Sequence, residues 1–352
     1  MPVRKVFRLP PLLLLSVVAA GCGPLVTKVA DSSRFNKGND IGPPSLANDD
    51  FLNDAASRFG VMALFAEVVY RRDLDIGVRD QDGCAYAAGN GRALPSFGMP
   101  DQNSQANSSE PRKRWKRWLA NSGNSPPGCV NQSGLYYETY VLEDVDGKLL
   151  EAVIAFRGTE NRPSQFFSDW TTNLTAAFAF EPKQYRLARD RVPTLITALK
   201  ERNPEIKIYA TGHSLGGGLA QQAGYLSKHV LEVFTFNTSP VTNWSHLRLK
   251  GEVGNAYPTF HRIYHGGEIL EKVRFVATSL TKARFGRHDI GLQLKSRSNF
   301  GGHSMQIIAC TFAEIIANRG IDDAEHFYPV DYIKTQVIPK TSEENVCSEN
   351  SE

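Results

Sequence analysis

Residues 206–220 read IKIYATGHSLGGGLA, and this stretch decides the fold class. Its first part, 206–210, is rich in residues that favour strands, and the Gly/Ala-rich part after Ser214 is typical of a closely packed helix. Between them, residues 212–216 fit G-x-S-x-G, the pattern of a sharp strand-to-helix turn. Glycines permit such a turn, which raises the serine hydroxyl to the edge of a sheet. We therefore expect Ser214 to lie at that edge as a nucleophile.

The segments around this turn alternate between strand and helix patterns. Residues 136–143 and 149–156 predict a hairpin, because an Asp-Gly pair lies between them. Strand–helix alternation predicts an α/β fold with a mostly parallel central sheet and helices on both faces. Further strands are expected at 230–236 and 260–264, and helices at 51–71, 184–202, 215–226 and 305–316.

A serine hydroxyl becomes a good nucleophile only when a base takes its proton, so the turn requires a histidine and an orienting acid. On α/β-hydrolase sheets the acid and then the histidine follow the serine in the chain. Of the eight histidines, His213 lies inside the turn and four others come too early, which leaves His288, His303 and His326. We expect His303 to be the base, because it follows two glycines and precedes an apolar helix. His288 is the second choice.

Three segments together resemble one family of enzymes. They are residues 155–159 (AFRGT), 169–170 (DW) and 210–220, and in this order they look like the class 3 lipases, which include the triacylglycerol lipases of filamentous fungi. The resemblance extends from Phe51 to about Asn318, apart from residues 80–132. It implies an α/β-hydrolase-type fold and a serine hydrolase that cleaves carboxylic esters of lipids, of the triacylglycerol lipase or the phospholipase type.

The resemblance also implies roles for individual residues. Ser214 matches the nucleophile, and the backbone amides of Thr159 and Leu215 match the two donors of the oxyanion hole. Residues 160–180 match a mobile lid. The aromatic side chains in this segment would either contact lipid or pack in the core.

The acid departs from the family's pattern. Glu268 stands where the family usually has an aspartate after an Asn. A glutamate orients an imidazole as an aspartate does, but its longer side chain requires a shifted loop, which the glycines at 266–267 allow. Asp289 is the competing acid. No metal or organic cofactor is expected, since neither C-x-x-C nor H-E-x-x-H occurs.

The N-terminus has the layout of a secretory signal. Three basic residues are followed by an apolar run, 12–20, that is too short to span a bilayer. Residues 19–22 (AAGC) resemble the lipobox of bacterial lipoproteins, in which the cysteine becomes the lipid-bearing N-terminus. We expect Cys22 to anchor an exported domain on a membrane; an ordinary signal peptide with a coincidental cysteine is the alternative. Gly23, rather than an aspartate, indicates the outer membrane in a Gram-negative cell, and the side of that membrane stays open.

Composition and charge limit the partners. With 352 residues, 41% of them hydrophobic, the chain is long and apolar enough for one large domain, which excludes disorder throughout. The formal charge of +3 comes from 40 basic and 37 acidic residues, and removal of residues 1–21 leaves 37 of each. A neutral mature chain gives no electrostatic argument for nucleic acid. The expected partners are a lipid or ester substrate and a membrane surface; the oligomeric state stays open.

The expected organisation is a signal peptide (1–21), an anchor and tether (22–50), a lipase-like domain (51–330) with an insertion at about 80–132, and a polar tail (331–352). Inside the insertion, residues 111–118 combine basic residues with two tryptophans, which would share a face if the segment were helical. Such a segment either docks on anionic headgroups or nucleic acid, or is a charged run that faces water.

The cysteines are consistent with an oxidising compartment. With Cys22 as the anchor, Cys84, Cys129, Cys310 and Cys347 remain, and they allow two disulfides in three pairings, or four free thiols. Pairing the first two with each other, and the last two with each other, would close one loop in each half of the chain.

A second class of function stays open at this point. A non-enzymatic outer-membrane lipoprotein would use the hydrolase fold as a binding scaffold, with an unsuitable acid or a distorted lid leaving the site inactive. The intact turn at Ser214 and the Arg157-Gly158-Thr159 segment count against this alternative.

Overall fold

The computed structural model describes residues 49–70, 84, 114–118, 128–158, 181–241, 243, 246–247, 258–265, 270, 287–292 and 303–319. The predicted signal peptide, Cys22, the tether up to residue 48 and the C-terminal tail lie outside these residues. No helix within the described ranges is both long enough and apolar enough to cross a membrane.

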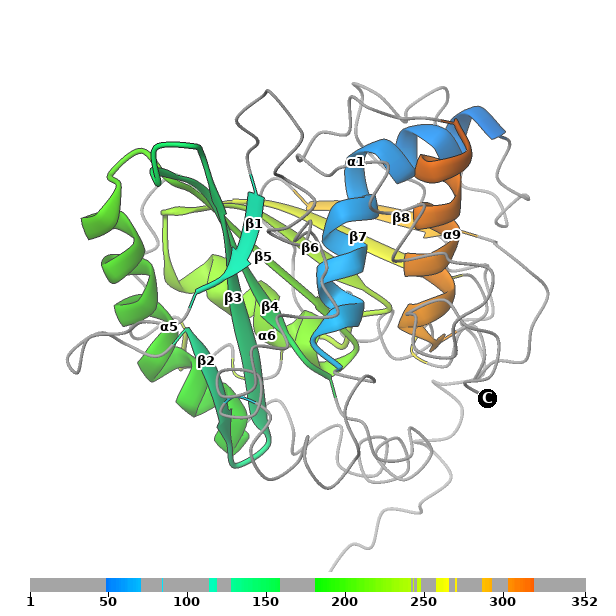
Figure 1. Cartoon of the computed structure of the whole chain (residues 1–352). Coiled ribbons are helices and arrows are strands. Elements are labelled where there is room, and N and C mark those ends of the chain that lie inside the picture. The colour runs from blue at the N-terminus through cyan, green and yellow to red at the C-terminus, as the bar shows by residue number, and fades with distance from the viewer. Residues whose placement is uncertain are drawn as a thin grey trace, which may run out of the picture.

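One mixed sheet of eight strands lies at the centre of the described part of the chain (Figure 1). The strands are β1 (Arg114–Arg117), β2 (Cys129–Gln132), β3 (Leu135–Glu143), β4 (Leu149–Phe156), β5 (Lys207–His213), β6 (Val230–Phe236), β7 (Thr259–His265) and β8 (Arg287–Leu292). They follow the order β1-β3-β4-β5-β6-β7-β8, and β2 also pairs with β3. β4 to β8 are mutually parallel, whereas β1, β2 and β4 each pair antiparallel with β3.

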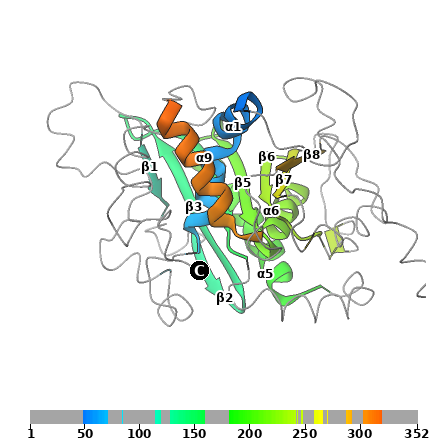
Figure 2. The same cartoon turned by 90° about the vertical axis from the view of Figure 1, so that its right-hand side faces the viewer.

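Helices cover both faces of this sheet. α1 (Asp49–Val68) and α9 (Met305–Arg319) lie side by side on one face, and α5 (Lys183–Arg202) and α6 (Leu215–Leu226) lie on the other (Figures 1 and 2). Each pair of helices encloses a hydrophobic core against the sheet. The mostly parallel sheet with helices on both faces confirms the predicted fold class.

The two cores explain the apolar character of β3 on both of its faces. Tyr136 and Tyr140 belong to the core under α1 and α9, and Tyr137 and Val141 to the core under α5 and α6. Successive strand residues point to opposite faces, so a strand covered on both sides has few polar positions. β3 and β4 form the predicted hairpin, which turns at Gly147 with a φ of +79°. Glycine adopts this left-handed conformation without steric cost.

The packing of α1 against α9 is close because Gly60 of α1 faces α9. A Cβ atom added at Gly60 would lie 2.6 Å from Cδ1 of Ile316. Phe312, on the same side of α9, is fully buried. α9 begins two residues after His303.

The structure corrects the interpretation of two parts of residues 80–132. β1 and β2 come from this stretch and pair with β3, so Arg114–Arg117 and Cys129–Gln132 belong to the central sheet rather than to an insertion outside it. The segment around β1 is not helical, and its tryptophans lie in different cores: Trp115 under α1 and α9, Trp118 against the core under α5 and α6. Trp115 is 1% exposed. The Lys116 ammonium lies 2.5 Å from Glu143. Residues 114–118 of the basic segment therefore form neither a docking helix nor a charged run that only faces water, and residues 111–113 lie outside the described ranges.

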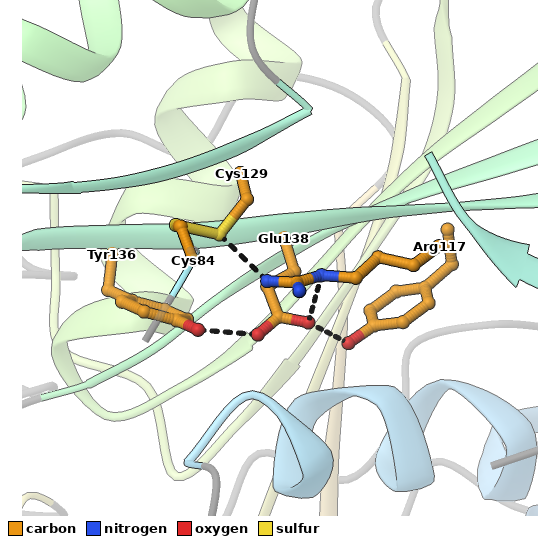
Figure 3. Close-up of a disulfide and its surroundings, with 6 residues drawn as sticks. Cys84, Arg117, Cys129, Tyr136 and Glu138 are labelled. Atoms are coloured by element: carbon orange, nitrogen blue, oxygen red, sulfur yellow. Dashed lines mark hydrogen bonds and ion pairs between the residues drawn. A yellow bond between two sulfur atoms is a disulfide. The ribbon is translucent and has the colours of Figure 1, made fainter. Parts of the chain in front are cut away.

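A buried carboxylate joins β1 to β3 (Figure 3). Glu138 has no exposed area, and its Oε1 accepts a hydrogen bond from the Tyr136 hydroxyl at 2.5 Å. The Tyr140 hydroxyl donates to Oε2, and Nε of Arg117 lies 3.2 Å from the same oxygen. A buried charge requires such partners, because the loss of hydration is otherwise uncompensated. The cluster thus explains how a basic strand is accommodated at the edge of an apolar core.

A disulfide lies beside this cluster. Cys84 is bonded to Cys129 of β2, 45 residues later, as in one of the pairings that the sequence allows. Nη2 of Arg117 donates a hydrogen bond to the Cys129 sulfur at 3.0 Å. Cys310 of α9 is disulfide-bonded as well, with a partner outside the described residues. At least three of the four predicted bridging cysteines are therefore oxidised.

Candidate active site

The turn at Ser214 has the predicted geometry. β5 ends at His213 and α6 begins at Leu215, so one residue separates strand from helix. Ser214 has φ of 54° and ψ of −123°, a region that costs a residue with a side chain about 1–3 kcal/mol. Four backbone hydrogen bonds hold it there: its amide donates to Phe236 O at 3.1 Å, and its carbonyl accepts from the amides of Ser239 at 3.0 Å, Gly217 at 3.0 Å and Gly218 at 3.3 Å.

The end of β4 lies against this turn because two glycines allow it. A Cβ atom at Gly216 would lie 2.2 Å from the carbonyl oxygen of Phe156. A Cβ atom at Gly158 would lie 3.2 Å from Cβ of Ser214 and 2.7 Å from the carbonyl oxygen of His213. The segment that leads to Thr159 is therefore in direct contact with the residue that carries the candidate nucleophile.

The structure brings Ser214 and His303 together. Nε2 of His303 lies 3.1 Å from Oγ of Ser214, within hydrogen-bond reach, although 89 residues separate them. The residues are only 7% and 5% exposed, respectively. Ser214 is placed by the junction of β5 and α6, and His303 by the turn that precedes α9. A hydroxyl and an imidazole in this arrangement form the pair that nucleophilic catalysis by serine requires.

The amide of Leu215 is available beside Ser214. Leu215 is the first residue of α6, and the first amides of a helix precede its first intrahelical hydrogen bond. They also form the positive end of the helix dipole, which favours negative charge. Thr159, the other predicted oxyanion donor, lies outside the described residues, although its neighbour Gly158 is described.

Of the two predicted acids, only the backbone of Asp289 falls within the described residues. Glu268 lies outside the described residues, between β7 and Leu270. The backbone of Asp289 lies within β8, where Asp289 is paired with Arg262 of β7. β8 itself was not expected from the sequence. His288, the second candidate for the base, also lies in β8, three strands and therefore roughly 14 Å from β5 at a spacing of ~4.8 Å per strand.

His213 contacts His303 and Tyr70 contacts His213, and the sequence indicated a role for neither of these two residues. Nε2 of His213 lies 2.7 Å from the carbonyl oxygen of His303, and Nδ1 of His213 lies 2.6 Å from the Tyr70 hydroxyl. The rings of His213 and His303 are 4.8 Å apart. No pattern in the sequence marks these contacts, apart from the position of His213 directly before Ser214.

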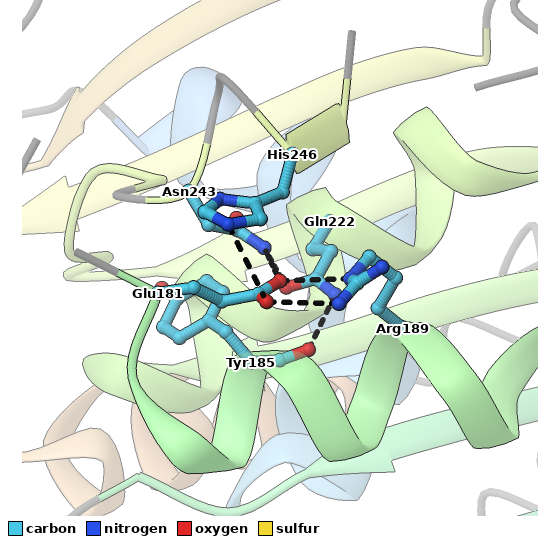
Figure 4. A network of polar contacts seen from close by, with 6 residues as sticks. All are labelled: Glu181, Tyr185, Arg189, Gln222, Asn243 and His246. Carbon is cyan, nitrogen blue, oxygen red and sulfur yellow. Dashed lines mark hydrogen bonds and ion pairs between the residues drawn. The ribbon is translucent and has the colours of Figure 1, made fainter. Parts of the chain in front are cut away.

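A polar network lies where the predicted lid segment, 160–180, rejoins the fold (Figure 4). The Glu181 carboxylate accepts two hydrogen bonds from Arg189 of α5, at 2.8 and 2.9 Å, and one from Asn243 at 2.9 Å. Asn243 follows β6 and also reaches Oε1 of Gln222 in α6, at 3.4 Å. His246 lies 3.9 Å from Glu181. The network fixes the start of α5 to the segment after β6.

This network predicts a pH-dependent stability. Burial by itself would raise the pKa of Glu181, but the hydrogen bonds from Arg189 and Asn243 outweigh it, so the pKa lies below its usual value. A lowered folded-state pKa means that the stabilisation is present above the unfolded pKa of about 4.3 and is lost as the pH falls through the folded value. Glu181→Gln is therefore expected to lower Tm by about 2–4 °C at pH 7, and less at pH 3.

Thermal unfolding followed by circular dichroism between pH 3 and pH 7 measures this difference. Glu205→Gln is the matched control, because Glu205 is exposed and lies after the end of α5 in the sequence. A difference in Tm between the native chain and Glu181→Gln that does not change with pH would contradict the role of the charge.

The described residues contain no group of three or more His, Cys, Asp or Glu side chains arranged to hold a metal ion. Within the part of the chain that the structure describes, the candidate site comprises Ser214, His303 and the backbone amide of Leu215.

One protein family matches the chain. Residues 101–257 fit the model of a phospholipase-like family, described as the Tle-like phospholipase domain. The match covers less than half of the chain, includes Gly158 and Ser214, and ends before Glu268 and His303. A search of curated proteins gave no significant match.

Solved structures of lipases are also similar to the chain. The lipase from Rhizopus microsporus var. chinensis is 17% identical, with 70% of this chain and 77% of that chain covered and a TM-score of 0.33. A mutant of MDLA from Penicillium cyclopium is 16% identical, with 72% and 83% covered and a TM-score of 0.36. The nonglycosylated LIP2 lipase of Yarrowia lipolytica is 17% identical, with 65% and 76% covered and a TM-score of 0.31. Over residues 101–257, the chain is thus similar to a phospholipase-like domain.

Proposed function

We propose that this chain is a serine hydrolase that cleaves carboxylic esters of lipids through an acyl-enzyme on Ser214. The observation that carries the proposal is the position of Ser214 at a strained strand-to-helix turn, with its Oγ 3.1 Å from Nε2 of His303. A strained backbone at a functional group persists only where the surrounding structure enforces it. The contact leaves the hydroxyl next to a base and next to the amide of Leu215.

The mechanism follows from these positions. Oγ of Ser214 attacks the ester carbonyl carbon while Nε2 of His303 takes the hydroxyl proton. The tetrahedral intermediate collapses, the bond to the alcohol oxygen breaks, and His303 returns the proton to the leaving alcohol. Water then attacks the acyl-enzyme, again with His303 as the base, and the fatty acid is released with Ser214 restored.

The charges that develop in these steps need partners. The amides of Leu215 and Thr159 hold the oxyanion in the proposal, and contact between Gly158 and Ser214 supports the second donor. Glu268 orients the imidazolium of His303. In the chain, Glu268 comes three residues after His265, where β7 reaches its carboxyl end. Asp289, in contrast, lies inside β8. Functional residues of parallel sheets gather beyond the carboxyl ends of the strands, which favours Glu268.

Lipid is the proposed substrate class for two reasons. The family model that matches residues 101–257 describes a phospholipase domain. The sequence of the proposed lid, 160–180, is rich in aromatic side chains, and the proposed lipid on Cys22 would hold the domain at a membrane surface, where such substrates lie. Export and anchoring at the outer membrane are parts of the same proposal.

Hydrolysis by the purified chain tests this function. We expect turnover of p-nitrophenyl butyrate and palmitate, release of fatty acid from phosphatidylcholine vesicles or from a triolein emulsion, and a fluorophosphonate adduct on Ser214 located by mass spectrometry. Faster release from the vesicles would favour the phospholipase type, and faster release from triolein the triacylglycerol lipase type. A folded chain with neither turnover nor adduct would contradict the proposal and favour the binding scaffold.

A further inference from the structure

We infer that His213, held by Tyr70, is a positioning residue that fixes the backbone of His303 at the distance from Ser214 that proton transfer requires. The inference rests on the proposed function. It concerns a buried histidine that takes no part in the steps above. His213 is 6% exposed and Tyr70 is 5% exposed, so both side chains are enclosed by the fold.

The hydrogen-bond partners of His213 determine its protonation. A carbonyl oxygen can only accept, so Nε2 of His213 must carry the proton that it shares with His303 O at 2.7 Å. In the neutral ring Nδ1 is then bare and accepts from the Tyr70 hydroxyl at 2.6 Å. Tyr70 thus selects the tautomer in which His213 can donate to the carbonyl of His303.

The hydrogen bond from His213 joins the base, His303, to the residue directly before the nucleophile, Ser214. His213 and Ser214 are consecutive residues, so one peptide unit joins the group that holds the base to the group that the base deprotonates. The hydrogen bond reaches the main chain of His303, so it restrains the position of the backbone that carries the imidazole. Tyr70 comes from the residues after α1, the helix that packs against α9. α1, which precedes Tyr70, thus packs against α9, which follows His303, and against β5, which ends at His213.

The position of His303 in the chain creates the need for such a contact. Two glycines, 301–302, precede it in the sequence, and glycine leaves the backbone more freedom than any other residue. A catalytic group must be held to about 0.5 Å, and a misplacement of about 1 Å costs roughly a hundredfold in rate. A hydrogen bond from a rigid strand end to the carbonyl of His303 supplies that restraint. Its loss is expected to lower kcat rather than to raise KM, because no substrate contact is involved.

Substitutions at His213 separate hydrogen bonding from volume. His213→Phe keeps a ring but removes both hydrogen bonds, and we expect kcat for p-nitrophenyl butyrate to fall about a hundredfold with KM within about twofold. His213→Gln places an amide donor near the position of Nε2, and we expect it to recover about tenfold of that loss. Tyr70→Phe removes only the hydroxyl and is expected to lower kcat about tenfold.

Tyr225→Phe is the matched control for the loss of a tyrosine hydroxyl. Tyr225 lies at the far end of α6, about 16 Å from Ser214 at a rise of ~1.5 Å per residue, and its ring stacks on Phe260. Equal kcat in His213→Phe and the native chain, or equal loss in His213→Gln and His213→Phe, would overturn the inference. If His213→Phe does not fold, the comparison of Tyr70→Phe with Tyr225→Phe decides the matter.

A measurement without substrate distinguishes failure of this inference from failure of the proposed function. In ¹⁵N-histidine-labelled chain, long-range ¹H–¹⁵N spectra report the tautomer of each ring, and we expect His213 to carry its proton on Nε2, with that proton protected from exchange. Tyr70→Phe should shift the Nδ1 resonance of His213. A proton on Nδ1 of His213 would overturn the inference even in an active enzyme. A native chain without turnover or adduct, but with the expected spectrum, would overturn only the proposed function.

Discussion

Ser214→Ala is expected to lower kcat/KM for ester hydrolysis by about 10⁴–10⁶-fold, because no other group in the proposed mechanism can form the acyl-enzyme. The substitution removes only Oγ, and the backbone hydrogen bonds that hold the turn stay in place. The unfolding free energy should therefore stay within about 0.5 kcal/mol of that of the native chain. Activity would be lost and structure kept, which is the result that separates a catalytic serine from a structural one.

The measurement combines initial rates with labelling. Rates of p-nitrophenyl butyrate hydrolysis and the mass of the fluorophosphonate adduct should both report the loss in Ser214→Ala. Ser227→Ala is the matched control: Ser227 follows the last residue of α6, so it lies about 20 Å from Ser214 along that helix at ~1.5 Å per residue. Residual turnover of more than a few per cent in Ser214→Ala, with the protein pure and folded, would contradict the acyl-enzyme on this residue.

The fold was predictable where side-chain patterns are local and regular. The hairpin of β3 and β4 has an Asp-Gly turn between two apolar strands, and α6 follows its strand through a recognisable turn. β1 and β8 had no such signal. β1 reads RWKR and β8 reads RHDIGL, and strands as short and charged as these depend on pairing with distant neighbours. The basic residues of β1 are tolerated only because acids of β3, Glu138 among them, lie opposite or beside them.

The candidate site was likewise predictable where a local sequence pattern marks its residues. Ser214 lies in a pattern that determines its own backbone, and the chain order of serine, acid and histidine left His303 as the most suitable base. The roles of His213 and Tyr70 depend on which carbonyl and which hydroxyl come within 3 Å in the folded state. A tyrosine at the end of an apolar helix has no feature in the sequence that separates a hydrogen-bond partner of this kind from an ordinary core residue.

The second large effect is expected from Gly216→Ala, a change of one methyl group in the first turn of α6. The new Cβ would lie 2.2 Å from the carbonyl oxygen of Phe156 and 2.8 Å from the carbonyl carbons of Phe156 and Arg157. These are backbone atoms, held by pairing of β4 with β5 and by the hydrogen bond from the Arg157 amide to Tyr136. An ordinary contact starts at 3.4 Å, so α6 and β4 would have to separate by more than 1 Å.

We therefore expect Gly216→Ala to lose about 3 kcal/mol or more of stability, and any folded fraction to lose about a hundredfold in kcat, because the junction that carries Ser214 is displaced.

Gly60→Ala is the matched control, since Gly60 is also a buried helical glycine but its closest new contact would be the tip of the Ile316 side chain, 2.6 Å away. That side chain can rotate, and alanine favours a helix by about 1 kcal/mol over glycine, so the stability of Gly60→Ala should change by no more than about 1 kcal/mol. Urea unfolding and the rate of p-nitrophenyl butyrate hydrolysis measure both quantities. Similar losses in the two variants would contradict the assignment of the close contact between α6 and β4 as the feature that holds the nucleophile in place.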